Sequence, residues 1–372
     1  MRLSRLAAVP KNRMARLVGR YFAPAELVEG RGRESDHNLR CLYVGEPKFR
    51  AYLFDLVFQD SPRSIRSFQA FLPRLGRVFV TTSFDLGVAL IPNRYEASLR
   101  GIYSYRATKN VRQETDISAP WEELVHSWQN YSETARRVRK AGLQVRISHE
   151  PRDFDFFYHH MFLPHVGKQY GQRAYVDSYE EMKPWFDRGL LVLVEEAGRT
   201  VAGGLCAVEG DTLVFYRTGV LEGDHELVRK GAQAAIYYFM LSYAKEQKLR
   251  SVNFLMSHAF VNNGVYKHKA GWGAKASPDN KAAQCLLYFV PEGNSKANLF
   301  LEKNPIIVGS EHGTLDVVTG WNGSAEGFAR AKERILRACA APGINRLFVR
   351  SASGAEIMEC HAARQRAAPP LS

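Results

Sequence analysis

Cysteine is scarce in this sequence and shows no paired spacing. The chain has five cysteines in 372 residues, and no two of them form a CxxC pair. An odd, scattered set argues against a disulfide framework and favours a reducing compartment, so we expect a cytoplasmic protein. The five positions are Cys41, Cys206, Cys285, Cys339 and Cys360.

Long apolar runs are also missing. A helix that crosses a bilayer needs ~20 consecutive, mostly apolar residues. Apolar stretches such as Val201–Cys206 and Leu286–Val290 are far too short for that. The sequence therefore predicts no membrane span.

Acidic residues are absent from the first 25 positions, where six basic residues precede Glu26. Pro10 and nearby charges interrupt any apolar core, which argues against a secretory signal. Residues 1–20 are therefore expected either to touch the inner membrane face or an acidic partner weakly, or to form a solvated basic arm. The whole chain has 51 basic and 38 acidic residues, and its net charge of +13 favours anionic partners: nucleic acid, phosphorylated cofactors, acidic carrier proteins or anionic lipid.

Common metal-binding and nucleophile patterns do not stand out. His159, His160 and His165 lack a known ligand spacing, so we expect no metal site. There is no clear Ser-His-Asp, Cys-His or Walker-type pattern. Any group transfer is therefore expected to be direct, without a covalent enzyme intermediate.

Apolar residues are abundant, at 45% of the chain, which is enough for two packed domains. Residues 40–116 resemble a small α/β unit, with strands predicted at 41–46, 52–58, 77–83 and 86–92. A helix is predicted over 64–75, because Ile65, Phe68, Phe71 and Leu72 share one helical face. A second helical stretch should begin at Ser118 as N-cap and end at Gly142, followed by a strand.

The clearest pattern is an antiparallel meander of three strands over residues 190–220. A helix broken at Pro164 is predicted before it. A loop at 221–230, a helix at 231–246 and strands at 251–256 and 283–290 are predicted after it. The remaining residues suggest a short α/β extension with a helix at 325–339 and a disordered end at 361–372.

This order of elements resembles the GNAT acyltransferase superfamily. The resemblance implies an α/β (α+β) fold with a mixed, mostly antiparallel sheet flanked by helices, in two GNAT-like halves. It also implies that the loop before the central helix binds the pyrophosphate of an acyl-CoA. That loop ends in R-x-x-A-x-A where the family has Q/R-x-x-G-x-G/A, and the residues implied in cofactor binding are Arg229, Lys230, Gly231 and Ala232.

The stretch GVYKHKAGWGA, residues 264–274, resembles a signature of the Fem-type (FemAB-like) branch of this superfamily. His268 replaces the branch's usual aromatic residue. Residues 112–145 resemble another segment of the branch, so the likeness covers about residues 110–290. The resemblance implies that Lys269 stabilises the oxyanion of acyl transfer and that Tyr266 protonates the leaving group.

Other residues are expected to contact substrate on the same basis: His165, Tyr170, Arg217, His258 and Trp272. The cluster Arg136, Arg137, Arg139 and Lys140 is either a phosphate site or a solvated helix face. These alternatives stay open at the level of sequence.

We therefore expect three segments: a degenerate GNAT-like half at 1–115, a catalytic domain at 116–295 and an extension at 296–372. The expected activity is acyl transfer from acyl-CoA or acyl carrier protein to an amine or hydroxyl of a sugar or amino compound, in envelope polysaccharide synthesis. The alternatives are an aminoacyl-tRNA-dependent transferase that forms an amide, and a non-enzymatic basic module that binds an anionic carrier or membrane.

Overall fold

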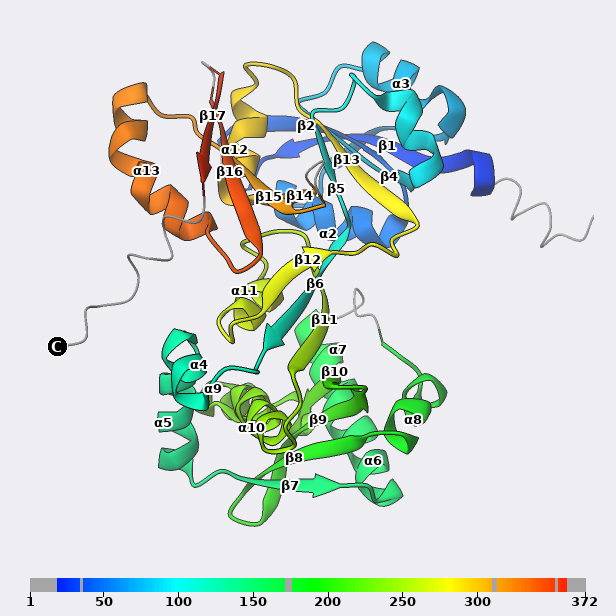
Figure 1. The fold of residues 1–372 in the computed structure, drawn as a ribbon. Coiled ribbons are helices and arrows are strands. Elements are labelled where there is room, and N and C mark those ends of the chain that lie inside the picture. Colours follow the sequence, from blue (N-terminus) through cyan, green and yellow to red (C-terminus); the bar gives the residue numbers. More distant parts are fainter. Residues whose placement is uncertain (1–18, 34–35, 171–175, 310–312, 352–353, 360–372) are drawn as a thin grey trace, which may run out of the picture. The chain divides into compact units, whose positions relative to one another are not determined.

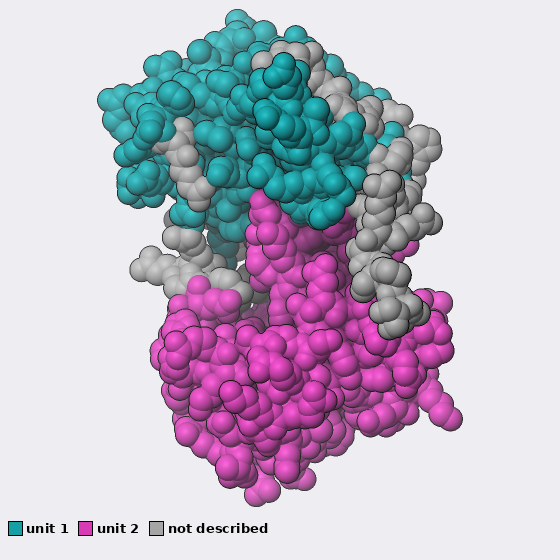
Figure 2. All heavy atoms as spheres, turned by 90° about the vertical axis from the view of Figure 1, so that its left-hand side faces the viewer, with its two compact units in different colours: residues 1–109, 279–339, 345–372 teal, residues 110–278, 340–344 magenta. Residues whose placement is uncertain are grey.

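The computed structural model describes residues 19–33, 36–170, 176–309, 313–351 and 354–359. Contacts divide the chain into two compact units, coloured in Figure 2. Unit 1 comprises residues 1–109, 279–339 and 345–372, and unit 2 comprises residues 110–278 and 340–344. The sequence-based division differs, because it separated residues 296–372 from the N-terminal half. The predicted basic arm falls almost wholly outside the described residues, and the predicted disordered end wholly outside them.

Unit 1 is built on a ten-stranded sheet to which residues before 110 and after 278 both contribute (Figure 1). Its strand order is β17-β16-β15-β14-β5-β13-β4-β2-β1-β3. Strands β2 and β4 are parallel, and β1 pairs antiparallel with β2 and β3. The strands are β1 Phe22–Arg31, β2 Asn38–Val44, β3 Arg63–Phe71, β4 Leu86–Pro92, β5 Tyr105–Ala107, β13 Gln284–Phe289, β14 Ile306–Gly309, β15 Leu315–Gly320, β16 Ile344–Ser351 and β17 Gly354–Glu359.

The helices of unit 1 pack apolar residues against this sheet. One buried cluster joins Leu42, Val44 and Leu287 of the sheet to Leu75 and Phe79 of a helix. The stacked rings of Phe79 and Phe289 lie 3.6 Å apart between centroids and close that cluster. The helices are α2 Pro47–Val57, η1 Leu72–Arg74, α3 Leu75–Thr81, η2 Asn93–Leu99, α12 Ser295–Lys303 and α13 Ala325–Cys339.

Three predictions in this unit are wrong. Residues 52–57 belong to helix α2, not to a strand, because Pro47 begins a helix whose buried residues repeat at four-residue spacing. Residues 64–75 were predicted to be a helix, but β3 occupies Arg63–Phe71 and pairs along β1. Residues 77–83 were predicted to be a strand, but α3 follows Pro73 there.

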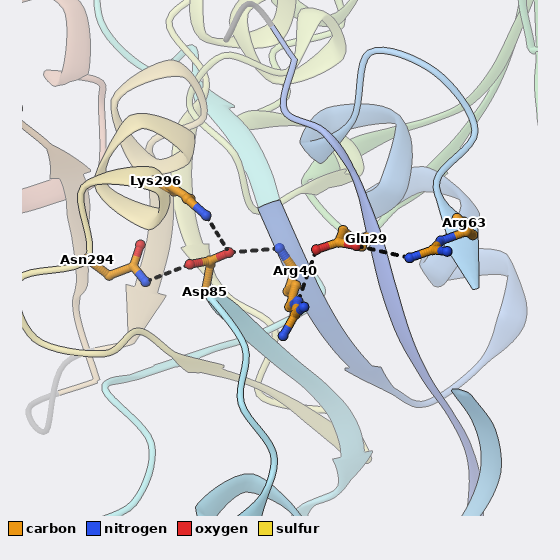
Figure 3. Close-up of polar contacts among 6 residues, drawn as sticks. All are labelled: Glu29, Arg40, Arg63, Asp85, Asn294 and Lys296. Carbon is orange, nitrogen blue, oxygen red and sulfur yellow. Dashed lines mark hydrogen bonds and ion pairs between the residues drawn. The ribbon is translucent and has the colours of Figure 1, made fainter. Parts of the chain in front are cut away.

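A row of polar contacts crosses four neighbouring strands of this sheet and reaches α12 (Figure 3). The backbone N–H of Arg40 donates to Asp85 at 2.8 Å, and the Arg40 Nε donates to Glu29 at 3.0 Å. Burial opposes ionisation of Asp85, yet the hydrogen bonds from Arg40 and Asn294 and the charge of Lys296 hold its pKa below its usual value. These contacts fix the strand ends relative to the helix. The row consists of Arg63, Glu29, Arg40, Asp85, Asn294 and Lys296.

Unit 2 is built on a seven-stranded sheet in the order β12-β6-β11-β10-β9-β8-β7. The predicted meander is confirmed as β8, β9 and β10, which pair antiparallel. The parallel pair in this sheet is β10 with β11. The strands are β6 Asn110–Asp116, β7 Gln144–Ser148, β8 Leu190–Glu196, β9 Arg199–Glu209, β10 Thr212–Val220, β11 Ser251–His258 and β12 Lys275–Pro278.

Both faces of this sheet are covered. Val192 and Val194 of β8 pack with Ile236 of α10 in one buried cluster, and Leu191 and Leu193 pack with Phe157 in another. The alternation follows from the two-residue period of a strand. The helices are α4 Trp121–Ser127, α5 Tyr131–Ala141, α6 Pro151–Phe156, η3 Phe157–Phe162, α7 Leu163–Tyr170, α8 Tyr179–Asp187, η5 Leu221–Gly223, α9 His225–Lys230, α10 Ala232–Glu246 and α11 Gly264–Ala270.

Two expected helix boundaries in unit 2 are wrong. Pro164 does not break its helix. The residues before it form the π-helix η3, and α7 continues through the proline. The π turn accommodates the residue that lacks a backbone N–H. Ser118 is not the N-cap of α4, which begins after Pro120, whereas the predicted end at Gly142 is confirmed by its φ of +62°.

The fold-class prediction is confirmed: both units are α/β, with mostly antiparallel sheets flanked by helices. Across the described residues, no helix has the length and apolar character needed to cross a bilayer.

Candidate active site

The parallel strands β10 and β11 separate part of the way along their length. Pairing joins Thr212–Val214 to Ser251–Asn253 and stops there, although both described strands continue, to Val220 and His258. Tyr237 of α10 packs against side chains of both strands where they separate. Its ring lies 4.8 Å from that of Phe215 on β10 and 5.4 Å from that of Phe254 on β11. We call this separation, beyond Val214 and Asn253, the strand split.

Both strands also bend at the split. The β10 register with β9 shifts between Phe215 and Arg217, and the β11 register with β6 shifts between Asn253 and Met256. Leu255 has a φ of +59°. A hydrogen bond of 2.8 Å from the Leu255 N–H to the Asn253 side chain stabilises this conformation. Bulges of this kind change the direction of side chains and backbone groups. The backbone groups of both strands therefore depart from regular pairing at this place.

Lys269 lies in this place with its charge almost wholly buried. It is near the end of α11, and Asn263 caps the start of that helix by accepting from the Tyr266 N–H at 3.0 Å. The Lys269 Nζ donates to the Met256 carbonyl of β11 at 2.9 Å, and the residue is only 6% exposed. Burial, with the nearby charge of Arg217, lowers the pKa of Lys269 to about 7.

Tyr266 precedes Lys269 by three residues and is 1% exposed. The Gln113 Nε2 of β6 donates to the Tyr266 carbonyl at 3.1 Å, and Ser257 donates to Gln113 at 2.7 Å. These buried hydrogen bonds fix α11 against β6 and β11. The residues at both predicted catalytic positions are thus held on one short, rigid helix.

Arg217 supplies a second positive charge. It forms an ion pair with the carboxylate of Asp177, which lies 40 residues earlier in the sequence. Its Nε is paired with Asp177, which is 3% exposed, and its Nη1 donates to the Tyr216 carbonyl at 2.7 Å. The Tyr158 hydroxyl donates to the Asp177 carbonyl at 3.1 Å. Sequence reasoning missed Asp177, because nothing in its local pattern connects it to β10.

Trp272 is wholly buried, so its place in the core favours a packing role over the predicted contact with substrate. Its Nε1 donates toward the His268 Nε2 at 3.4 Å, and its ring stacks on Tyr237. Burial, and then the charge of Lys269, lowers the pKa of His268 to about 4, so His268 is neutral near pH 7. The following Gly273 has a φ of +75°, and a Cβ there would lie 2.3 Å from the Trp128 indole nitrogen. The turn therefore requires glycine.

The predicted phosphate-binding residues lie at the N-terminus of α10, but they do not form an open loop. Arg229 and Lys230 end helix α9, and the Gly231 N–H already donates to the Val228 carbonyl at 3.0 Å. Ala232 is buried at the start of α10. Arg137 of α5, one of the predicted basic cluster, lies over Gly231 and donates to the Arg229 carbonyl at 3.2 Å.

The other expected substrate contacts are distributed around these features. His165 is buried, and its Nε2 lies 3.5 Å from the amide nitrogen of Gln233, near the start of α10. Burial, with the charge of His225, lowers the pKa of His165. His258 ends β11 and is half-buried. Tyr170 ends α7, and its side chain lies outside the described part of the chain.

His159, His160 and His165 each make different contacts. His160 pairs with Glu222 at 3.0 Å, and the His159 ring stacks on Tyr179. Within the described ranges, no three side chains of His, Cys, Asp or Glu come together as metal ligands.

Comparisons with known proteins identify a domain within unit 2. Residues 127–269 match the acetyltransferase (GNAT) domain family, a span that begins just before α5 and ends at Lys269. Curated protein sequences gave no match.

Several solved structures are distantly similar to the chain. FemX is 12% identical with a TM-score of 0.37, and the match covers 72% of this chain and 85% of that one. L-PGS from Bacillus licheniformis is 10% identical with a TM-score of 0.34, over 71% of this chain and 84% of that one. A GCN5-related N-acetyltransferase from Sphaerobacter thermophilus is 12% identical with a TM-score of 0.34, over 67% and 71%.

Proposed function

We propose that the chain, whose residues 127–269 match the GNAT acetyltransferase domain family, is an acyltransferase with its active site at the strand split. It moves an acyl group from a thioester donor, acyl-CoA or acyl carrier protein, directly to an amine or hydroxyl of a sugar or amino compound. The observation that carries this proposal is the buried ammonium group of Lys269 at the point where β10 and β11 separate.

The strand split supports binding of an extended donor. Where β10 and β11 no longer pair, their facing edges present main-chain N–H and C=O groups. An extended chain that contains amides can pair with such edges much as an added strand does. The amide-containing arm of an acyl carrier or of coenzyme A has this character.

Lys269 supports the chemical step. When the acceptor attacks the thioester carbonyl, a carbon–nitrogen or carbon–oxygen bond forms and the carbonyl oxygen becomes negative. The pKa of Lys269 is low because its ammonium group is buried and lies near the charge of Arg217. An anion that develops beside this group compensates its charge, so the interaction is stronger in the transition state than in the ground state.

Collapse of the tetrahedral intermediate breaks the carbon–sulfur bond and releases a thiolate. We assign the proton that the thiolate receives to Tyr266, one helical turn before Lys269. The proton that the acceptor loses as its new bond forms restores the Tyr266 hydroxyl, so the thiol leaves protonated and the net proton count is unchanged. Arg217 adds fixed positive charge beside the reacting carbonyl, and Asp177 holds it in place.

The start of α10 supports a site for the donor's phosphates. Arg137, Arg229 and Lys230 gather there beside the positive end of a 15-residue helix. Because the Gly231 N–H is already bonded, we assign phosphate binding to these side chains and to the first free turn of α10.

The test is a donor screen on the full chain. Acetyl-CoA, longer acyl-CoAs, acyl carrier protein and charged tRNA are each tested by thermal shift and by intact-mass detection of a transferred acyl group. We expect thioester donors to raise the melting temperature. A response confined to charged tRNA would favour the amide-forming transferase instead. No response to any donor would contradict acyl transfer and favour a binding module.

A further inference from the structure

Half of the exposed large apolar side chains gather at one end of unit 1. Ten such side chains are exposed among the described residues, and five of them lie in residues 20–22, 71–80 and 100–102. Single exposed apolar residues are ordinary, but a group of them marks an interaction surface. The five are Tyr21, Phe22, Phe71, Val80 and Ile102.

Direct contacts join the three segments. The rings of Phe22 and Phe71 lie 5.2 Å apart, where the start of β1 pairs with the end of β3. Residues 72–74 then lead into α3, and a Cβ on Gly76 of that helix would lie 2.8 Å from the Ile102 Cδ1. Val80 follows Gly76 by one helical turn, so it shares a side of α3 with Ile102. We call residues 20–22, 71–80 and 100–102 the apolar–basic face; Figure 1 shows α3 and the start of β1 at the same end of unit 1.

The charge of this face is of one sign. Its three segments contain four arginines and no acidic residue. Arg94 and Tyr95 of η2 both donate to the Arg20 carbonyl, at 2.7 and 2.8 Å, and so attach residue 20 to the unit. Residues 1–18, which precede the face in the sequence, contain five basic residues and no acid. The four arginines of the face are Arg20, Arg74, Arg77 and Arg100.

The excess charge of the chain is concentrated in the same part. Residues 1–109 contain 19 basic and 9 acidic residues, a net +10 of the total +13, whereas residues 110–278 contain 21 and 20, a net +1. A partner attracted by charge therefore meets unit 1 first.

We propose that the apolar–basic face docks unit 1 on an anionic lipid surface. Arginine and aromatic side chains are suited to the interface between headgroups and acyl chains, and aliphatic tips such as Val80 gain free energy by entering it. Each arginine near an anionic bilayer adds electrostatic attraction. Nucleic acid would use the charges but gains little from Val80 and Ile102, so it fits the face less well. The proposal is independent of the acyltransferase activity.

The experiment is flotation of the full chain with vesicles of phosphatidylcholine and phosphatidylglycerol, compared with pure phosphatidylcholine, at ~0.15 M salt. We expect flotation with the anionic vesicles alone. The double variant Arg74→Glu/Arg77→Glu should lower the partition coefficient by about tenfold or more. Val80→Ser/Ile102→Ser should lower it by about fivefold, and this loss should persist at higher salt, because burial of apolar groups is not screened.

Matched controls change the same residue types in unit 2. Arg152→Glu/Arg199→Glu makes the same change in charge, and Val145→Ser/Val208→Ser removes exposed apolar groups. Both controls should float like the unsubstituted chain.

Three results would overturn the proposal. The first is no flotation of the unsubstituted chain, and the second is equal loss in the controls. The third is a stable dimer that Val80→Ser/Ile102→Ser dissociates, without any flotation, since that would assign the face to a second copy of the chain.

Discussion

Lys269 is the residue on which the proposed chemistry depends most directly. We expect Lys269→Ala to lower turnover by ~100-fold or more, because the developing oxyanion loses its cation. Lys269→Arg should be similarly impaired, since the larger planar group does not fit a site built around one Nζ bonded to Met256. The measurement is steady-state turnover with the donor found in the screen. The control is Lys267→Ala, which removes an exposed lysine from the same helix; equal turnover in the two alanine variants would contradict the assignment.

The pKa of Lys269 sets the expected pH dependence. If the protonated amine stabilises the oxyanion, kcat/KM should decrease as pH rises through about 7, the pKa of this group. Residual activity of Lys269→Arg should lack that decrease, because arginine stays charged. A pH profile of both proteins checks this. An increase near pH 7 that the variant loses would instead make Lys269 a general base.

The same burial has a cost in stability. The pKa of Lys269 lies below its ordinary 10.5, so the folded state binds its proton less tightly than the unfolded state does. The cost of this lowered pKa, about 5 kcal/mol, is complete below pH 7, declines between pH 7 and 10.5, and disappears above that. Lys269→Met should remove this cost and lose about 1 kcal/mol of hydrogen bonding. Urea unfolding should therefore show a gain of roughly 4 kcal/mol at pH 6 and little or none above pH 10.5; a loss of stability at pH 6 would contradict the buried charge.

At the level of elements, the start of α10 is expected to bind the donor's phosphates. Arg229→Glu and Arg137→Glu should each raise the donor's dissociation constant by about tenfold, with little change in melting temperature. Higher salt should weaken binding to the unsubstituted chain. Titration calorimetry measures both effects.

Lys140→Glu is the control for this prediction. Lys140 is exposed near the end of α5, so its replacement makes the same change in charge and leaves the pair of Arg137 with Glu133 intact. Donor affinity that is unchanged in Arg137→Glu and Arg229→Glu would place the phosphates elsewhere.

Elements with strong periodic patterns could be predicted from sequence. The meander β8–β10 has alternating or continuous apolar runs that end in short turns, and α10 is long enough to be recognised. Residues 52–83 were misread because short apolar runs fit either period. Pairing with β1 makes residues 63–71 a strand, whereas Pro47 and Pro73 begin helices. Tertiary pairing and proline position decided these cases, not local propensity.

The same limit applies to the site. Lys269 and Tyr266 stand in one short motif, and its resemblance to the Fem-type signature suggested both residues. The pair of Arg217 with Asp177 joins β10 to a residue before α8, and Arg137 reaches α10 from α5. Such contacts form only when segments that are distant in the sequence fold together, so no residue spacing predicts them.

At the level of the whole molecule, the two units differ in how the chain supplies them. All seven strands of the unit 2 sheet lie within residues 110–278, whereas five strands of the unit 1 sheet come after residue 278. A chain ended after Pro278 should therefore keep the sheet of unit 2 folded, although it lacks residues 340–344 of that unit, and it should lose unit 1. Limited trypsin digestion should degrade residues 1–109 and leave a fragment near 110–278. Equal protection of residues 1–109 and 110–278 from trypsin, or equal degradation of both, would contradict this prediction. The full chain, digested in the same way, is the control.

The composite sheet of unit 1 also imposes an order on synthesis. Ala107 of β5 pairs with Leu286 and Val308, which leave the ribosome about 180 and 200 residues later. At ~5–20 residues per second, the first strands wait roughly 10–40 s for their neighbours. During that time unit 2 can fold completely, while β4 and β5 still expose edges that the later strands will cover. Residues 110–278 can thus complete folding before residues 22–107 do. A chaperone that holds unfolded segments would be expected to bind residues 22–107 during this time.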